Sequence, residues 1–345
     1  DLHRRRHSFP TRRSSDLTLT LVATLLASSC KRNNSSFDGP SLSDLNGQFG
    51  MLQPFQASKS TVDFSKAETV GFTAKFTKLC DWTIRIKGSN SGAQKFITGK
   101  SRIIDASTAT WNGSTTLFPL FKNEPCVATL LVNGVADTFN VTIGITGLRI
   151  PAGFVVANFE SGMNTKWTTF IQSGGGMDFK IHNDQFNVEG SNYLNMAGTV
   201  NWDWLIGMID FPASAYGKTT YPLSSVGEDV YFNCLIYGKA NTNESRVLFQ
   251  FREDDNGNGK FDPASDDQYD NELRVTWEGW KLVSFKYTDM IHLVNGVPAS
   301  NNGNSRHNPN SLVMVSMLHL ANPSNGAAST KVDCIMFTEK GPLEL

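Results

Sequence analysis

The sequence predicts an all-β protein made of an N-terminal immunoglobulin-like sandwich followed by a larger β-jelly-roll sandwich. Runs rich in Thr, Val and Phe are short, and Gly, Asn and Ser separate them; the chain holds 29 glycines. Such runs bounded by turn residues are typical of strands. No short repeat period is visible, which favours sandwiches over a propeller. With 345 residues the chain is long enough for two domains.

Composition narrows the classes of function. Hydrophobic residues make up 39% of the chain, charged residues 18%, and the formal net charge is -1. These values describe an ordinary, nearly neutral globular protein. Nucleic-acid binding needs clustered Lys and Arg, and no such cluster follows the first fifteen residues. A nucleic-acid partner is therefore not expected.

The start of the chain is predicted to be a targeting segment preceded by foreign sequence. Residues 1–16 resemble a translated sequencing adapter, and we exclude them from the fold. Leu17–Ser29 is an apolar run that is too short to span a bilayer and ends in small residues before Cys30. The residues around Cys30 resemble a bacterial lipobox, which implies lipidation of that cysteine; cleavage without lipidation stays open. Residues 1–44 are thus predicted to hold an artefact, a lipoprotein signal peptide and a polar tether, with the membrane reached only through lipid.

Residues 45–149 form the predicted immunoglobulin-like domain. Its alternating runs are Thr69–Phe76, Trp82–Lys87, Ala128–Val132 and Asp137–Ile145. Cys80-Asp81-Trp82-Thr83-Ile84 and Thr110-Trp111-Asn112-Gly113 resemble the strand and turn of immunoglobulin-like modules. We expect Trp82 and Trp111 in the core of a domain that acts as a spacer.

Five cysteines leave one over, and assigning Cys30 to lipid leaves four. An exported chain sits in an oxidising compartment, so we expect a disulfide between Cys80 and Cys126. Cys234 and Cys334 are either a second bridge or two buried thiols.

A loop in the C-terminal half carries oxygen-bearing side chains at regular steps: Asp254, Asn256, Asn258, Asp262 and Asp266. A chain curling round calcium presents alternate side chains inward, and Gly259 permits the sharp turn. The spacing resembles extracellular calcium repeats more than an EF-hand, whose twelfth position would be Glu where this loop has Ser265. We expect structural calcium here. A solvated hairpin tip is the alternative, because Asp, Asn and Gly also favour turns.

Residues 150–345 contain eight or nine strand-length runs, which suits a jelly roll. The residues Asn158-Phe159-Glu160, Trp277–Val283 and Val332-Asp333-Cys334-Ile335 give this half its family likeness. It resembles the galactose-binding-like carbohydrate-binding modules of exported glycan-utilisation lipoproteins of Bacteroidetes type. In such modules a calcium ion ties the first strand to the last, which nominates Glu160 and Asp333. Two carboxylates brought together by neighbouring strands repel unless a cation or proton lies between them. Two exposed strand-end charges are the alternative.

Sugar recognition needs flat apolar rings beside polar groups that satisfy hydroxyls. All seven tyrosines and five of the seven tryptophans fall in residues 150–345. The candidates for sugar contact are Trp202, Trp204, Tyr216, Tyr221, Tyr269 and Trp280. Trp202 and Trp204 would share one face of a strand, and a buried core pair is the open alternative. Loop residues such as Tyr216 are favoured because loops lie at the surface.

No string of residues indicates catalysis. The C-terminal half has no E-x-D-x-E strand, and the chain has no G-x-S-x-G or phosphate-binding loop. The sequence therefore predicts a non-enzymatic, polysaccharide-binding lipoprotein, surface-exposed on the outer membrane of the cell envelope beside other glycan-uptake proteins. Two alternatives stay open: a structural or adhesive protein that binds another protein, and a glycan-active hydrolase or lyase.

Overall fold

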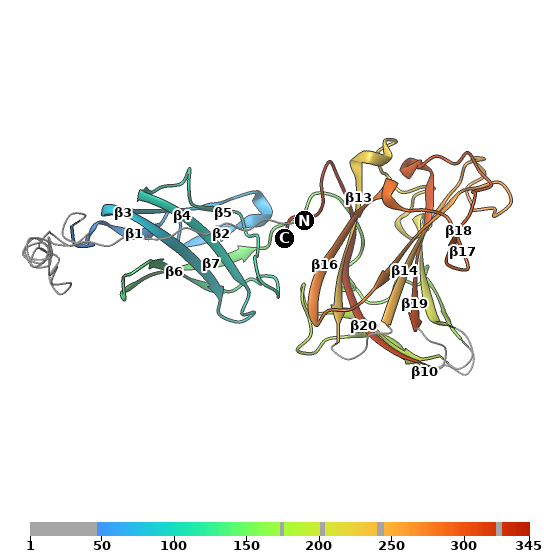
Figure 1. Cartoon of the computed structure of the whole chain (residues 1–345), viewed down its shortest axis with the longest axis horizontal. Helices are drawn as coiled ribbons and strands as arrows, with labels where there is room; N and C mark the ends of the chain where they lie inside the picture. The colour runs from blue at the N-terminus through green and yellow to red at the C-terminus, as the bar shows by residue number, and fades with distance from the viewer. Residues whose placement is uncertain (1–46, 173–175, 201–203, 240–244, 322–325) are drawn as a thin grey trace, which may run out of the picture. The chain divides into compact units, whose positions relative to one another are not determined.

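The computed structural model describes residues 47–172, 176–200, 204–239, 245–321 and 326–345. Its longer elements are all strands, joined by loops and short 3-10 turns (Figure 1), so the predicted all-β class is confirmed. Within the described ranges no helix has the length and apolar character needed to cross a membrane. The predicted signal peptide and tether, with Cys30, lie outside these residues, and so does Trp202.

The N-terminal sandwich is built around one long strand. Its strands are β1 (Met51–Ala57), β2 (Thr61–Asp63), β3 (Val70–Gly88), β4 (Gln94–Ile104), β5 (Thr110–Trp111), β6 (Pro125–Val132) and β7 (Thr138–Gly147). β3 pairs with β1 and β5 near its start and with β6 farther along. The two strands predicted over 69–87 are therefore a single strand, with a pairing irregularity between Lys75 and Cys80. Trp82 and Trp111 are buried as expected.

The predicted disulfide between Cys80 and Cys126 is wrong. Both are buried free thiols. The pairing of β3 with β6 places Cys126 opposite Gly88, eight residues along β3 from Cys80. At about 3.3 Å per residue that separation is roughly 26 Å, far beyond disulfide reach. Cysteine counting took no account of strand register.

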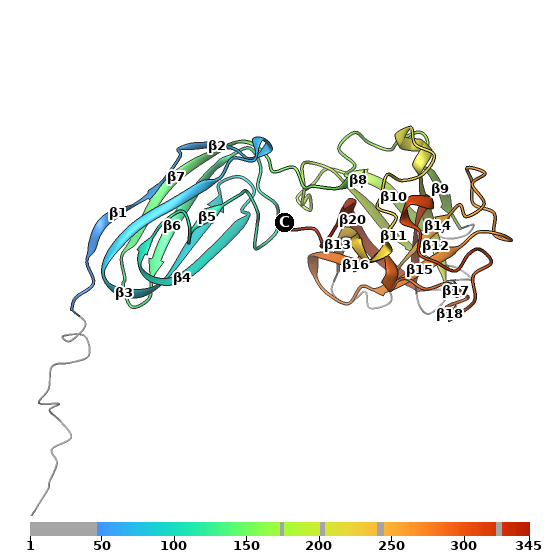
Figure 2. The same cartoon turned by 90° about the horizontal axis from the view of Figure 1, so that it is seen from above.

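The second sandwich consists of two facing sheets (Figures 1 and 2). One sheet has the order β10-β11-β20-β13-β16, and β8 also pairs with β20. Its strands are β8 (Phe154–Ala157), β10 (Gly176–His182), β11 (Tyr193–Thr199), β13 (Val230–Gly238), β16 (Gly279–Lys286) and β20 (Ala327–Glu339). The other has the order β15-β14-β19-β12-β9. Its strands are β9 (Thr168–Ile171), β12 (Leu205–Pro212), β14 (Ser245–Glu253), β15 (Gln268–Arg274) and β19 (Leu312–Ala321). A small hairpin joins β17 (Leu293–Val294) to β18 (Val297–Pro298).

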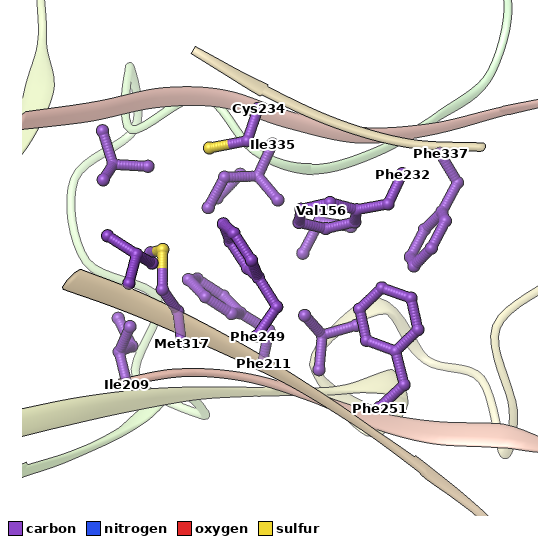
Figure 3. Packing of buried hydrophobic residues seen from close by; sticks show 14 of the residues in the cluster. Val156, Ile209, Phe211, Phe232, Cys234, Phe249, Phe251, Met317, Ile335 and Phe337 are labelled. Atoms are coloured by element: carbon purple, nitrogen blue, oxygen red, sulfur yellow. The ribbon is translucent and has the colours of Figure 1, made fainter. Parts of the chain in front are cut away.

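The core of the second sandwich lies between these sheets. Burial along β14 alternates residue by residue, as a strand with one face on a core requires. Figure 3 shows Phe249 and Phe251 from one sheet pointing toward Phe232 and Phe337 from the other. The ring centroids of Phe232 and Phe249 lie 5.0 Å apart. Full burial of each such ring contributes about 1.5–3 kcal/mol, so this aromatic layer holds the sheets in place.

No described strand of residues 51–147 pairs with a strand of residues 154–339. The domain boundary at residue 149 stays a prediction. Cys234 and Cys334 are buried free thiols that pack in different hydrophobic clusters. Cys334 sits where the pairing of β13 with β20 is irregular, and its φ is +48°.

Candidate functional site

The outer face of the five-stranded sheet carries a row of polar side chains. The row is in register across all five strands and consists of Thr168, Asp210, Ser316, Gln250 and Asp270. Side chains alternate along a strand, and Phe249 and Phe251 enter the core, so Gln250 lies on the opposite face. The Asp210 carboxylate accepts hydrogen bonds from the hydroxyls of Thr168 and Ser316. The polar row is thereby held in place by its own neighbours.

An apolar row runs beside the polar row. It is formed by Phe170, Met208, Leu318 and Leu248, again in register across neighbouring strands. Phe170 is 46% exposed, and the other three are half-buried. At the β15 end the row meets Glu272, which forms an ion pair with Arg246. Apolar side chains are thus open to solvent along a stripe on a face that also carries fixed polar groups.

Arg252 completes this face. Its guanidinium donates to Gln250 Oε1 and to Gln268 Oε1, each at 3.2 Å. Its Nη1 lies 4.0 Å from Asp210 Oδ1, and its side chain is 21% exposed. The ring of Phe261 lies 5.6 Å from the guanidinium carbon. Arg252 is therefore positioned before any ligand arrives and has donor capacity to spare.

Together these rows, which we call the sheet face, can satisfy an amphipathic ligand. An apolar stripe suits the C–H side of a sugar ring, and the half-buried amide of Gln250 and guanidinium of Arg252 suit its hydroxyls. Asp210, Ser316 and Asp270 are themselves buried and serve only as the polar support of these two groups. Sequence analysis missed this face, although the alternation in β14 of Val247, Phe249 and Phe251 with Leu248, Gln250 and Arg252 indicated it. It missed the two edge strands, β9 and β15, because their residues lack an apolar alternation.

Only one of the described candidate aromatics is well exposed. Trp204 is 47% exposed just before β12, and its carbonyl accepts a hydrogen bond from Ala321 N at 2.9 Å. It therefore lies at one end of the same sheet. Trp202, its predicted partner, is outside the described residues.

The three predicted tyrosines are not sugar platforms. Tyr221 and Tyr269 are buried, and Tyr216 is half-buried against the core. The hydroxyl of Tyr221 donates to Phe211 O at 2.7 Å and that of Tyr216 to Val156 O at 2.5 Å. Tyr216 lies in a short 3-10 turn and Tyr221 in a loop, and each ring packs on the core while its hydroxyl finds a backbone carbonyl. Tyr269 lies on β15, and its hydroxyl donates to Asp267 Oδ2 at 3.3 Å. The prediction for these tyrosines is wrong.

Trp280 lies on the outer face of the other sheet. It is half-buried, and its indole N–H donates to Phe186 O at 2.8 Å. Its ring meets those of Tyr193 and Tyr237 edge to face. The Lys331 ammonium lies 4.7 Å from the Phe186 ring centroid and 5.2 Å from that of Tyr237. These rings already contact one another and a cation, so Trp280 is a weaker candidate for stacking on sugar than Trp204.

The predicted ligands of the acidic loop converge. Asp254 accepts hydrogen bonds from the backbone N–H groups of Asn258 and Gly259, at 3.0 and 2.7 Å. Asp266 accepts from the side chain of Asn256 and from the backbone of Asp262. The spacing therefore folds the loop around its own carboxylates, an arrangement that can hold a hard cation. Whether calcium binds there stays a prediction.

The strand that precedes Glu160 also meets the strand that carries Asp333. β8 pairs with β20, and Ile335 lies opposite Ala157. Glu160 Oε1 accepts from the backbone of Ser191 and Asn192, at 2.9 and 2.8 Å. A Cβ on Gly190 would lie 2.5 Å from the Glu160 carboxyl carbon, so only glycine permits this approach.

Glu189 is a third carboxylate here, and sequence analysis missed it because it stands alone in a loop. Its backbone N–H donates to Asp333 Oδ2 at 3.3 Å. Burial raises the pKa of Asp333 to about 9, and Glu189 and Glu160 act in the same direction. Burial and Glu160 raise the pKa of Glu189 to about 7. Such carboxylates suit a shared cation or shared protons.

Comparison with known proteins finds similarity among solved structures. No protein-family model matches the sequence, and no curated protein does. Among solved structures, the chain is similar to the family 11 carbohydrate-binding module of a cellulosomal cellulase of Clostridium thermocellum. The identity is 14%, the match covers 55% of this chain and 96% of that one, and the TM-score is 0.37.

A second similar structure is a xylan-binding domain from Paenibacillus barcinonensis, with 14% identity, coverage of 55% and 97%, and a TM-score of 0.31. A third is described as a carbohydrate-binding module of the β-sandwich superfamily, with 12% identity, coverage of 85% and 99%, and a TM-score of 0.38. Similarity this distant is evidence of neither ligand nor site.

Proposed function

We propose that this chain binds polysaccharide without converting it, through the sheet face. The observation that carries the proposal is the apolar row of Phe170, Met208, Leu318 and Leu248 beside a polar row that Arg252 extends. Binding along such a face costs the protein little side-chain ordering, because the polar groups are already oriented. Trp204 at one end of the sheet would add a ring for one more sugar.

The remaining parts of the proposal concern place and support. Lipidated Cys30 would anchor the chain to the outer membrane, and the immunoglobulin-like sandwich would act as a spacer. Calcium at the acidic loop, and at Glu160 and Asp333, would stabilise the jelly roll. Neighbouring glycan-uptake proteins of the outer membrane would receive the bound polysaccharide. These features rest on the sequence patterns, and the two calcium sites rest also on the hydrogen bonds from Glu189 to Asp333 and from Asn256 to Asp266.

Affinity electrophoresis of the purified chain through gels that contain soluble polysaccharides tests the proposal. We expect at least one polysaccharide to retard the wild type. Phe170→Ala removes the exposed ring and Arg252→Ala removes the oriented donors, and each should weaken binding by about tenfold. Lys180→Ala is the matched control, because Lys180 is exposed on the outer side of the other sheet.

The outcomes separate the classes of function. Retardation that both face variants abolish and Lys180→Ala preserves supports the sheet face. No retardation on any polysaccharide favours a protein-binding role. Release of reducing ends or unsaturated sugars during incubation would mean that the chain is an enzyme. Melting curves of each variant show whether lost binding is only lost folding.

A further inference from the structure

Three carboxylates gather at the base of the β14–β15 hairpin, apart from the ligands predicted for the acidic loop. Glu253 ends β14, Asp255 follows two residues later, and Asp267 directly precedes β15. One carboxylate oxygen from each lies within 4.8 Å of the other two. Because side chains alternate along extended chain, these odd-numbered residues point away from Asp254 and Asp266.

The cluster is buried and lacks a protein cation. Glu253 and Asp267 are fully buried, and Asp255 is half-buried. Over the residues that the structure describes, no Lys or Arg forms an ion pair with any of the three. Like charges this close in a buried place repel strongly and require a counter-charge.

The hydrogen bonds leave part of the cluster unsatisfied. Glu253 Oε1 accepts from the hydroxyl of Tyr287 and from the backbone of Asn308, both at 2.8 Å. Glu253 Oε2 is buried and has no hydrogen-bond partner among the described residues. A buried carboxylate oxygen without a donor is costly unless a ligand completes it.

The surroundings orient the other two carboxylates. Asp267 accepts from Gly303 N at 2.8 Å and from the Tyr269 hydroxyl at 3.3 Å. Asp255 Oδ2 accepts from Asp267 N at 2.9 Å. A Cβ on Gly303 would lie 2.0 Å from Asp255 Oδ2 and 2.5 Å from Asp267 Oδ1, so glycine leaves room for these oxygens. Carboxylates that are held in place around an oxygen without a hydrogen-bond partner leave that oxygen available to a cation.

We propose that Glu253, Asp255 and Asp267 bind a calcium ion that is separate from any ion in the acidic loop. Oxygen-only ligands select a hard cation, and the irregular geometry of a strand end and a loop suits calcium better than magnesium, which demands a near-octahedral shell. The ion would also fix the hairpin that carries Arg252 and Gln268, the direct chain neighbours of Glu253 and Asp267. The site does not depend on the proposed glycan binding.

Calcium titration of the chelator-treated full chain, followed by calorimetry and metal analysis, tests the proposal. We expect Glu253→Gln and Asp267→Asn each to remove one bound calcium per chain or to weaken it by more than about tenfold. The matched control is Asp289→Asn, at an exposed position outside both groups of carboxylates, which should leave this ion bound. Asp254→Asn, in the predicted ligand set of the acidic loop, should affect only an ion bound in that loop. Comparing the calcium bound by the single variants Glu253→Gln and Asp254→Asn then shows which of the two candidate ions each variant loses.

Terbium, a luminescent substitute for calcium, gives a readout that needs no ligand variant. Tyr287 and Tyr269 donate to Glu253 and Asp267, so ion bound there should be sensitised by tyrosine excitation. Tyr269→Phe should reduce that luminescence while calcium still competes for the site. Gly303→Ala, which crowds two ligands, should weaken binding without removing a charge. Unchanged calcium stoichiometry and affinity in Glu253→Gln and Asp267→Asn, or no tyrosine-sensitised luminescence in the wild type, would overturn the proposal.

Discussion

His319 on β19 shows how a single buried group links stability to pH. Its imidazole is fully buried, and Nδ1 lies 3.0 Å from Thr330 Oγ1. Burial lowers its pKa to about 4, because the charged ring would lose its hydration. The unfolded chain, with an ordinary pKa near 6.5, takes up the proton first. The stability that neutral His319 contributes is therefore present above about pH 6.5 and is lost as the pH falls toward 4.

We predict that urea denaturation of wild type and His319→Gln will show this window. The difference between their unfolding free energies should shift by about 2 to 3 kcal/mol between pH 7 and pH 4.5, with the wild type losing more. Taking the difference cancels the titration of carboxylates common to both proteins. Parallel pH profiles would show that His319 does not remain neutral in the folded protein.

Also at the residue scale, the sequence shows which residues are aromatic but did not predict which of their rings are exposed. Trp204 and Tyr221 both stand next to turn residues, yet Trp204 is 47% exposed and Tyr221 is 1% exposed. The difference arises because the loop of Tyr221 covers the core, a long-range contact with no counterpart in local sequence. Phe170 was missed for the opposite reason, since it lies on a short edge strand without apolar alternation.

At the scale of elements, strand register decides which residues meet. Strand register keeps Cys80 and Cys126 apart. If the two were linked, the disulfide would close a 46-residue loop and add about 2–4 kcal/mol to the free energy of unfolding.

We predict that reductant leaves the melting temperature of the chain unchanged. Loss of a stabilising bridge would instead lower it by several degrees. Thiol titration in denaturant without reductant should find Cys80, Cys126, Cys234 and Cys334 all reactive. Finding Cys80 and Cys126 linked by mass spectrometry would contradict the strand register described here.

Register also brings β8 to β20, and the sequence anticipated that pairing through Glu160 and Asp333. It did not anticipate Glu189, because a lone acid in a loop has no periodic pattern to identify it. The three carboxylates now suggest a staple between the first and last strands of the jelly roll.

We predict that chelation destabilises the chain and that Asp333→Asn reduces this effect. Removing a bound ion leaves the buried Asp333 carboxylate without a counter-charge beside Glu189, so the wild type should melt at a lower temperature in chelator. Asp289→Asn, at an exposed position, is the control and should respond like wild type. Equal chelator shifts in Asp333→Asn and wild type would exclude a cation at this staple.

At the scale of the whole molecule, composition and turn residues were enough to predict an all-β chain. Most central strands were identified because they are strand-length apolar runs bounded by turn residues. The edge strands β9 and β15 were missed, and with them the rows of side chains that cross the five-stranded sheet. Those rows exist only once five distant segments are aligned, so no single stretch of sequence contains them.

Hydroxyl-radical footprinting with and without a polysaccharide that retards the chain tests the location of binding most directly. Phe170, Met208 and Leu318 have reactive side chains on the sheet face, and Tyr237 and Trp280 lie on the other sheet. The account predicts that bound polysaccharide lowers labelling at Phe170 and Met208 and leaves Tyr237 and Trp280 unchanged. Protection at Tyr237 and Trp280 with none at Phe170 and Met208 would contradict it.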